Sequence, residues 1–200
     1  MRYLALAVAL AALAGCAGGA PARGAAPPAL APGDGGLPHT AGCATHPSPP
    51  AMSVDGTPQP ANQEALDEVA SRIEPYATEH FPDVYAGLEL RQETGRIRVY
   101  RKPSAPFDAW LGHAFAADCV EVADAVHARR ELRALADRIA ADLESWHAKG
   151  LEIATVSAAE DGSVVRVGTT DVARARQEFT QRYGGDAPIE VVFEQPPRPL

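Results

Sequence analysis

The stretch Gly87-Leu88-Glu89-Leu90, with Ile97-Arg98-Val99 and Val120-Glu121-Val122 after it, decides the fold of this 200-residue chain. Apolar and polar residues alternate in these segments, as is typical of strands with one buried face. The recurrence of this series predicts two similar units, whether it reflects an internal duplication or two copies of one motif that share a period. The matching segments, in the same order, are Gly150-Leu151-Glu152-Ile153, Val165-Arg166-Val167 and Ile189-Glu190-Val191.

Turn and helix signals give each unit the order strand, strand, helix, strand. The first unit covers residues 84–123 and has a turn signal at Glu93-Thr94-Gly95. The second unit covers residues 150–194 and has its turn signal at Asp161-Gly162. The residues predicted to cap the short helix of each unit are Ser104 and Asp171.

Two further helices are predicted outside these segments. One covers residues 61–77 and is brought to an end by Pro75 and Pro82, since proline does not continue a helix. The longest helix covers residues 128–149 and links the two units. Its apolar stripe of helical period consists of Leu132, Leu135, Ile139, Leu143 and Trp146.

These elements together predict an α+β fold, in which two strand-strand-helix-strand units are joined by a long helix. Each sheet would have one apolar face, and a helix is needed to cover it. We therefore expect helices packed on a mostly antiparallel sheet, a globular domain at residues 61–194 and a short proline-rich tail at residues 195–200.

The N-terminus carries an export signal at residues 1–15. Arg2 precedes an apolar run of about ten residues, half of what a bilayer-spanning helix needs. The run ends in Leu13-Ala14-Gly15-Cys16, which resembles the bacterial lipoprotein signal. The resemblance implies cleavage before Cys16 and attachment of acyl chains, such as palmitate, to this cysteine. An ordinary secretory signal with a coincidental cysteine is the alternative.

Residues 16–60 are predicted to be the lipidated cysteine followed by a disordered tether. Ten of the 18 prolines fall there, apolar periodicity is absent, and such a segment buries too little surface to offset its ordering entropy. His39, Cys43 and His46 lie close together within it, but a zinc site normally needs a fourth ligand on a rigid frame. We interpret these three residues as part of a solvated linker and predict no metal site.

Cys43 and Cys119 are the cysteines that remain once Cys16 is assigned to lipidation. An exported protein meets an oxidising compartment, where disulfides form and persist. The sequence therefore allows a bond between Cys43 and Cys119. It equally allows two free thiols, since it does not reveal the distance between them.

A basic cluster lies on one predicted hairpin of this acidic chain. The formal net charge of −8 argues against nucleic acid as a partner, because phosphate binding needs a clustered positive surface. The cluster could instead meet anionic lipid headgroups or wall polymers, or it could be a solvated sheet face. Its members are Arg91, Arg96, Arg98, Arg101 and Lys102.

The predicted units also resemble the pro-region of secreted bacterial serine proteases of the streptogrisin and alpha-lytic type. In that family, a strand-turn-strand-helix unit is followed by a longer helix and a second unit, and the pro-region acts as a folding chaperone and inhibitor. No protease domain and no Gly-Asp-Ser-Gly nucleophile signature follow here, so the resemblance does not imply protease activity. The residues that carry it are 85–90, 94–99 and 119–122, and it covers residues 84–194.

Sequence signatures of catalysis are missing as well. The chain has no Gly-x-Ser-x-Gly elbow, no phosphate-binding glycine loop and no histidine pair at helical metal spacing. We therefore predict no catalytic residues and no cofactor. The sequence predicts a lipoprotein anchored on the extracytoplasmic face of the cell membrane, whose domain is a non-enzymatic interaction module for an envelope protein or wall polymer. A protease-inhibiting or protease-folding module is the alternative.

Overall fold

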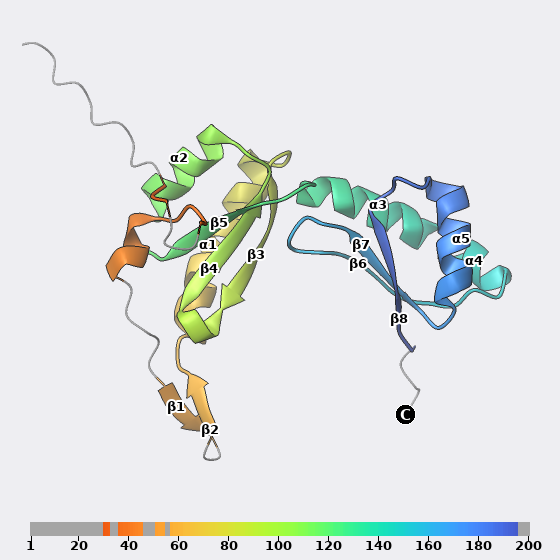
Figure 1. Ribbon diagram of the computed structural model, residues 1–200, viewed down its shortest axis with the longest axis horizontal. Coiled ribbons are helices and arrows are strands. Elements are labelled where there is room, and N and C mark those ends of the chain that lie inside the picture. The colour runs from red at the N-terminus through yellow and green to blue at the C-terminus, as the bar shows by residue number, and fades with distance from the viewer. Residues whose placement is uncertain (1–29, 33–35, 46–50, 55–56, 196–200) are drawn as a thin grey trace, which may run out of the picture.

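The computed structural model describes residues 30–32, 36–45, 51–54 and 57–195. Two units follow one another, each with a helical segment, a hairpin, a crossover helix and a last strand (Figure 1). The first unit consists of α1 (Gln63–His80), β3 (Tyr85–Arg91), β4 (Arg96–Arg101), α2 (Ala105–Ala114) and β5 (Val120–Asp124). The second consists of α3 (Arg129–Ala141), α4 (Leu143–Ala148), β6 (Ile153–Ala158), β7 (Val165–Thr169), α5 (Val172–Tyr183) and β8 (Ile189–Phe193).

Each unit builds a three-stranded mixed sheet. The central strand β4 pairs antiparallel with β3 and parallel with β5, and β7 pairs in the same way with β6 and β8. The parallel pairing follows from the crossover helix, which returns the chain to the starting end of the sheet. The α+β fold with two strand-strand-helix-strand units is thus confirmed. The expectation of a mostly antiparallel sheet is corrected, because each sheet is mixed, with one antiparallel and one parallel pairing.

Corresponding irregularities support the view that the units are two versions of one structure. The first strand of each hairpin shifts register, between Tyr85 and Gly87 in β3 and between Ile153 and Thr155 in β6. The crossover helices are capped as predicted. The side chains of Ser104 and Asp171 each accept a hydrogen bond from the backbone N–H three residues later.

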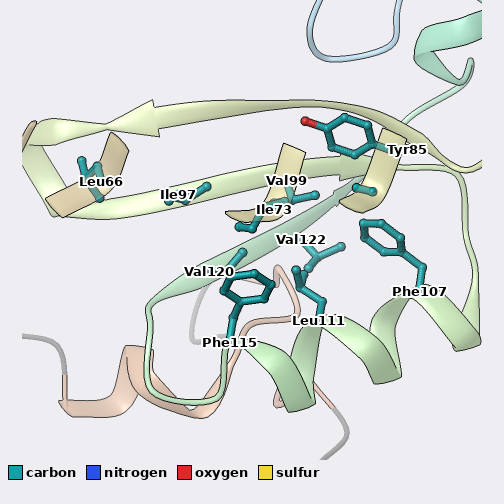
Figure 2. Packing of buried hydrophobic residues seen from close by; sticks show 11 residues of the cluster. Leu66, Ile73, Tyr85, Ile97, Val99, Phe107, Leu111, Phe115, Val120 and Val122 are labelled. Atoms are coloured by element: carbon teal, nitrogen blue, oxygen red, sulfur yellow. The ribbon is translucent and has the colours of Figure 1, made fainter. Parts of the chain in front are cut away.

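Each unit has a hydrophobic core of its own, and the two cores share no residue. In the first unit, Ile97 and Val99 of β4 face Ile73 of α1 and Phe107 of α2, and all four are fully buried (Figure 2). The helices therefore cover one face of the sheet and leave the other open. The buried residues of the second core are Leu132, Leu135, Ile139, Trp146, Leu151, Val165, Val167, Ala175, Phe179 and Val191.

The helix α1 runs through Pro75 and ends at His80, three residues beyond the predicted end at residue 77. Proline inside a helix removes a hydrogen bond and costs about 3 kcal/mol. Ile73 and Ala77 on either side of it are fully buried, and α1 packs along β3 and β4. We attribute the continuation of the helix to His80 to the burial of this face, which outweighs the local cost.

The prediction of one long helix over residues 128–149 is wrong in one respect, because this stretch forms two helices, α3 and α4. Asp142 separates α3 from α4, and its carboxylate accepts hydrogen bonds from Arg182 and from the Tyr183 hydroxyl of α5, both at 2.9 Å. The break directs Trp146 of α4 into the second core, where it is 2% exposed. The two helices therefore belong to the second unit.

Part of the segment predicted as a disordered tether is structured. Residues 30–32 and 36–45, here called the strap, lie along the outer edge of β5, and Leu30 packs against the first core (Figure 1). The contacts that order the strap come from residues far away in the sequence, which composition does not reveal. The other elements before α1 are the short 3-10 helix η1 (Ala41–Thr45) and the hairpin strands β1 (Ala51–Val54) and β2 (Thr57–Pro60).

Candidate functional site

The predicted lipidation site, Cys16, lies outside the described residues, together with the whole predicted signal peptide. Within the described part of the chain, no helix combines the length and apolar character that crossing a bilayer requires. Acylation of Cys16 therefore stays a prediction.

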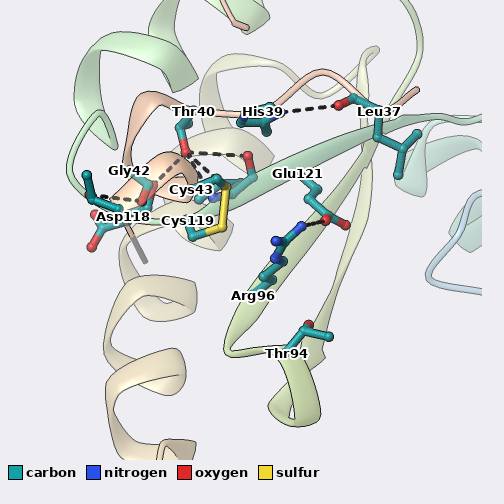
Figure 3. The surroundings of a disulfide bond; sticks show 12 residues. Leu37, His39, Thr40, Gly42, Cys43, Thr94, Arg96, Asp118, Cys119 and Glu121 are labelled. Atoms are coloured by element: carbon teal, nitrogen blue, oxygen red, sulfur yellow. Dashed lines mark hydrogen bonds and ion pairs between the residues drawn. A yellow bond between two sulfur atoms is a disulfide. The ribbon is translucent and has the colours of Figure 1, made fainter. Parts of the chain in front are cut away.

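Cys43 and Cys119 form a disulfide, which is one of the two alternatives that the sequence allows (Figure 3). Cys43 lies in η1 of the strap, and Cys119 directly precedes β5. Close packing accompanies the bond. A Cβ atom on Gly42 would lie 2.5 Å from the carbonyl oxygens of Ala117 and Asp118, so only glycine fits there. The strap is thus fixed to the loop that enters β5.

Thr40 joins the strap to the edge of β5 and is 1% exposed. Its hydroxyl donates a hydrogen bond to the Asp118 carbonyl at 2.5 Å and accepts one from the Val120 N–H at 2.9 Å. Backbone bonds continue the pairing: Thr40 N–H donates to the Val120 carbonyl at 3.0 Å, and Val122 N–H donates to the Pro38 carbonyl at 2.8 Å. The strap therefore acts as a short fourth strand on the first sheet.

Two members of the predicted basic cluster are neutralised by one carboxylate. Arg96 and Arg98 both bind Glu121 of β5, at 2.6 and 3.0 Å, and the Glu121 side chain is only 12% exposed (Figure 3 shows the Arg96 bond). Burial by itself would raise the pKa of Glu121. Hydrogen bonds and attraction from the two arginines outweigh burial, so the pKa lies below its ordinary value.

The other members of the cluster do not complete a basic surface. Arg101 lies on the opposite face of the sheet, 6% exposed, where it binds Asp108 of α2 at 2.8 Å. This hydrogen bond is the main reason why the pKa of Arg101 is raised. Lys102 binds Glu131 of α3 at 2.9 Å, whereas Arg91 makes no ion pair within the described residues. The five residues are thus not one free anionic-partner surface.

The weak metal-ligand group of the sequence is not assembled in the described region. The sulfur of Cys43 is part of the disulfide, and His46 lies outside the described residues. His39 lies in the strap and pairs with Glu121 as an antiparallel bridge. Among the described residues, no cluster of three or more histidine, cysteine, aspartate or glutamate side chains is placed to hold a metal ion.

A cavity of about 270 Å³ lies where α1 and the start of β3 meet the first turns of α3. Glu74 of α1 is ion-paired with Arg129 of α3, and Arg130 and Arg133 line the cavity too. The Tyr85 hydroxyl is buried without a hydrogen-bond partner among the described side chains, and burial, followed by the charge of Glu74, raises its pKa. Tyr85 therefore stays protonated at physiological pH. The Glu74–Arg129 ion pair beside the cavity joins the first unit to α3.

The hairpin turn of the second unit packs on the linker between the units. His127 N–H donates to the Gly162 carbonyl at 3.0 Å, and Gly162 adopts a φ of +70°. A Cβ atom at Gly162 would lie 2.5 Å from the His127 carbonyl oxygen and 2.8 Å from the Cβ of Ala86. Glycine is therefore required at this turn by both its conformation and its close contacts.

A groove of about 430 Å³ lies in the second unit between α5 and the outer edge of β8. Phe179 and Thr180 of α5 line one side, and Ile189 and Val191 of β8 line the other. The loop residues that complete it are Gly184, Gly185 and Ala187.

Sequence reasoning missed both the strap and this groove. For the strap, a usable signal was Cys43 itself, a cysteine inside a proline-rich segment with a second cysteine at the start of a predicted strand. For the groove, the signal was that a proline-rich segment with a cysteine precedes only the first unit, so the last strand of the second unit has no such segment to cover its edge. Comparison with protein-family models and with curated proteins finds no match for this chain.

Proposed function

We propose that the protein is a lipid-anchored, extracytoplasmic and non-enzymatic interaction module of the cell envelope. The observation that supports this most strongly is the Cys43–Cys119 disulfide, because such bonds persist in oxidising compartments outside the cytoplasm. The disulfide agrees with the export and acylation implied by Leu13-Ala14-Gly15-Cys16. A small domain whose second sheet ends in the edge strand β8, with a groove beside it, is suited to binding a partner.

The strap limits how far the domain can lie from its anchor. We expected a free tether up to residue 60, but Leu30 already packs on the first core. Thirteen residues separate Cys16 from Leu30. A fully extended chain spans at most about 3.6 Å per residue, so the anchor lies within roughly 50 Å of the strap. The partner is therefore a component close to the membrane surface.

Replacement of the lipidated cysteine tests the anchor. In cells that produce Cys16→Ser, the protein should leave the membrane fraction, because two or more acyl chains are needed for stable attachment. Ala20→Ser is a matched control in the same segment and should stay in the membrane fraction. Intact-mass measurement should find the acyl chains on the wild type and on this control, and not on Cys16→Ser. Equal membrane attachment of Cys16→Ser and the wild type would contradict the proposed anchor.

Cross-linking in living cells tests the interaction. The wild-type chain should be captured together with a specific envelope component, and a variant that ends after residue 29 keeps the anchor but lacks the domain. If the wild type recovers nothing beyond what this anchor-only control recovers, the domain is not an interaction module. This outcome is independent of whether Cys16 is acylated.

A second candidate function is inhibition or folding of a serine protease. The observed order of a hairpin, a crossover helix and a strand, then a longer helical segment and a second such unit, is the order that the resemblance to protease pro-regions implies. Titration of the protein against bacterial trypsin-like and chymotrypsin-like proteases tests this. Unchanged protease activity, together with unchanged refolding of the denatured proteases, would remove the candidate.

A further inference from the structure

The strands β5 and β8 occupy the same position in their sheets. Each follows a crossover helix and pairs in parallel with the central strand. The pairing begins with Ile97 opposite Val120 in the first sheet and with Val165 opposite Ile189 in the second. The outer edges of β5 and β8 therefore correspond residue by residue, starting from Val120 and Ile189.

In the first unit, this edge is bonded to the strap. The Thr40 hydroxyl lies between two backbone groups, the Asp118 carbonyl and the Val120 N–H. Further along, Val122 N–H donates to the Pro38 carbonyl. In these hydrogen bonds, β5 and the loop before it contribute only main-chain atoms, so the hydrogen bonding does not depend on the side chains of β5. The Cys43–Cys119 disulfide fixes the strap in addition.

In the second unit, the corresponding groups bond to each other or stay open. Ile189 N–H, which corresponds to the Val120 N–H, donates directly to the Ala187 carbonyl at 2.7 Å. Val191 N–H corresponds to the Val122 N–H and has no acceptor among the described residues. Arg176 of α5 donates to the Val191 carbonyl at 3.3 Å, and no segment of the described residues pairs with this edge. The edge of β8 thus offers the same main-chain N–H groups as β5.

The surroundings of β8 have room for such a segment. The groove of about 430 Å³ lies beside the last strand β8, between this strand and the crossover helix α5. Phe193 at the end of β8 is 66% exposed, although its strand neighbour Val191 is buried. An exposed apolar side chain on an open edge strand favours pairing with another chain.

We propose that the outer edge of β8 binds an extended segment of another polypeptide, antiparallel to β8, in the way that the strap binds β5. The segment carries a proline two residues before a threonine or serine, as Pro38 precedes Thr40. The hydroxyl takes the place between Ile189 N–H and the Ala187 carbonyl, and the proline carbonyl accepts from Val191 N–H. This inference rests on the proposed function as an interaction module and names its partner as an extended peptide.

A second copy of this chain is a less suitable occupant. Its own strap is bonded to β5 through Cys43 and Cys119, so exchange of straps between copies would require the disulfide to open. A segment from another protein has no such restriction. Binding replaces one existing hydrogen bond, from Ile189 to Ala187, with bonds to the hydroxyl and adds the bond to Val191.

The test uses the full chain with Cys16→Ser, isotopically labelled for NMR, and a synthetic peptide with the sequence of residues 30–45 in which Cys43 is replaced by serine. Titration should shift the amide signals of Ile189 and Val191 and slow their hydrogen exchange. A peptide that also carries Thr40→Val loses the hydroxyl bonds and should bind about tenfold more weakly.

A pair of protein variants tests the groove. Thr180 and Gln181 are neighbours on α5 and both are exposed, but only Thr180 lines the groove. Thr180→Arg should weaken peptide binding by at least about tenfold through steric exclusion, and Gln181→Arg, with the same change in charge, should bind like the parent. Because both sites are exposed, neither variant should disturb the fold.

Several results would overturn the inference. Strap-like binding at β8 is excluded if the peptide causes no shifts, if the shifts are confined to β5, or if the peptides with and without Thr40→Val bind with equal affinity. Shifts of β8 that depend on protein concentration without peptide would show self-association in place of a partner. None of these results bears on the membrane anchor. If the Thr180→Arg variant still captured an envelope component in cells, the protein would remain an interaction module, but its binding surface would lie away from β8.

Discussion

The two units have the same backbone order but differ in what covers the outer edge of the last strand. In the first unit, Pro38 and Thr40 of the strap bond to β5, and the disulfide holds them there. In the second unit, Ile189 bonds to the nearby Ala187 and the edge of β8 faces a groove. The repeat itself therefore determines strand order and core, whereas the protection of its edge comes from a segment outside the repeat.

The units also differ at one buried polar position. Arg101 ends β4 and is held by Asp108 of the crossover helix, whereas Thr169 ends β7 and donates its hydroxyl to the Glu152 carbonyl at 2.6 Å. Both residues are buried, at 6% and 0% exposure. A buried polar group needs a partner, but the kind of partner can change between copies. The two units thus agree in the burial and position of this residue, but they differ in its side-chain type and in its hydrogen-bond partner.

The largest expected effects come from emptying one core and leaving the other intact. Phe107 of α2 and Phe179 of α5 are buried in separate cores. Phe107→Ala and Phe179→Ala should each lower the free energy of unfolding by about 3–5 kcal/mol, through lost burial and the cavity left behind. Hydrogen exchange should show the loss of protection in the mutated unit first.

An exposed site provides the control for this pair. Val126 in the linker is 72% exposed, so Val126→Ala should change stability by less than about 0.5 kcal/mol. If Phe107→Ala and Phe179→Ala both reduced protection equally in β4 and β7, the two cores would unfold as one cooperative body. The description of two units with independent cores would then be incorrect.

Removal of the disulfide should affect one unit only. The bond closes a loop with a sequence separation of 76. The chain-entropy model assigns a loop of this size about 4 kcal/mol, so Cys43→Ala combined with Cys119→Ala should destabilise the first unit by up to that amount. Urea unfolding can be followed through Trp110 in the first unit and Trp146 in the second, in variants that keep one tryptophan. An equal loss at both tryptophans would contradict the prediction.

The alternation of apolar and polar residues was enough to predict the six strands of the two units and their order along the chain, and residue type predicted the caps at Ser104 and Asp171, because these features depend on neighbours in the sequence. The strands β1 and β2, in the predicted tether, were missed. The helix break at Asp142 could not be predicted in this way, since it is bonded to Arg182, which lies 40 residues later. Continuation of α1 through Pro75 likewise depends on burial against a sheet that forms later in the chain.

The strap and the basic cluster show the same limit. Proline-rich composition predicts a tether, whereas the strap is ordered by the hydrogen bonds of Thr40 and Pro38 to β5 and by the Cys43–Cys119 disulfide. The cluster was counted along the sequence, but Glu121 on another strand neutralises Arg96 and Arg98. The burial of Arg101 could have been foreseen, because alternation places it on the same face as Ile97 and Val99. Composition and local charge predict a surface only after the partners of each residue are known.

A smaller effect is expected from making the edge of the first unit resemble that of the second. Thr40→Val keeps the shape of the side chain but removes the hydroxyl between the Asp118 carbonyl and the Val120 N–H. We expect a loss of about 1–3 kcal/mol in the first unit, reduced if these two groups bond directly, as Ala187 and Ile189 do. Thr40→Ser keeps the hydroxyl and serves as the control. Equal stabilities of Thr40→Val and the wild type would show that the hydroxyl does not help to hold the strap, which would then be held by its main-chain bonds and the disulfide.

The smallest effect is expected at the open faces of the two sheets, and it should depend on pH. Glu121 accepts hydrogen bonds from both Arg96 and Arg98, whereas Glu190 binds Arg166 at 2.9 Å on the exposed face of the second sheet. A carboxyl group whose folded-state pKa is lowered stabilises the fold above its unfolded-state pKa, and this contribution is lost as pH falls through the folded-state value. The pKa of Glu121 lies below the ordinary 4.5, because its two arginine partners outweigh the opposing effect of burial.

Glu121→Gln should therefore cost about 1–2 kcal/mol at neutral pH, and the difference from the wild type should shrink as pH falls below the ordinary value for a glutamate. Glu190→Gln removes a more exposed pair and should cost less than about 1 kcal/mol. Urea unfolding of both variants and the wild type at neutral and acidic pH measures these differences. A cost of Glu121→Gln that stayed constant down to the most acidic pH would assign the role of Glu121 to packing. The second arginine partner of Glu121 would then add no electrostatic stabilisation beyond that of the single Arg166–Glu190 pair.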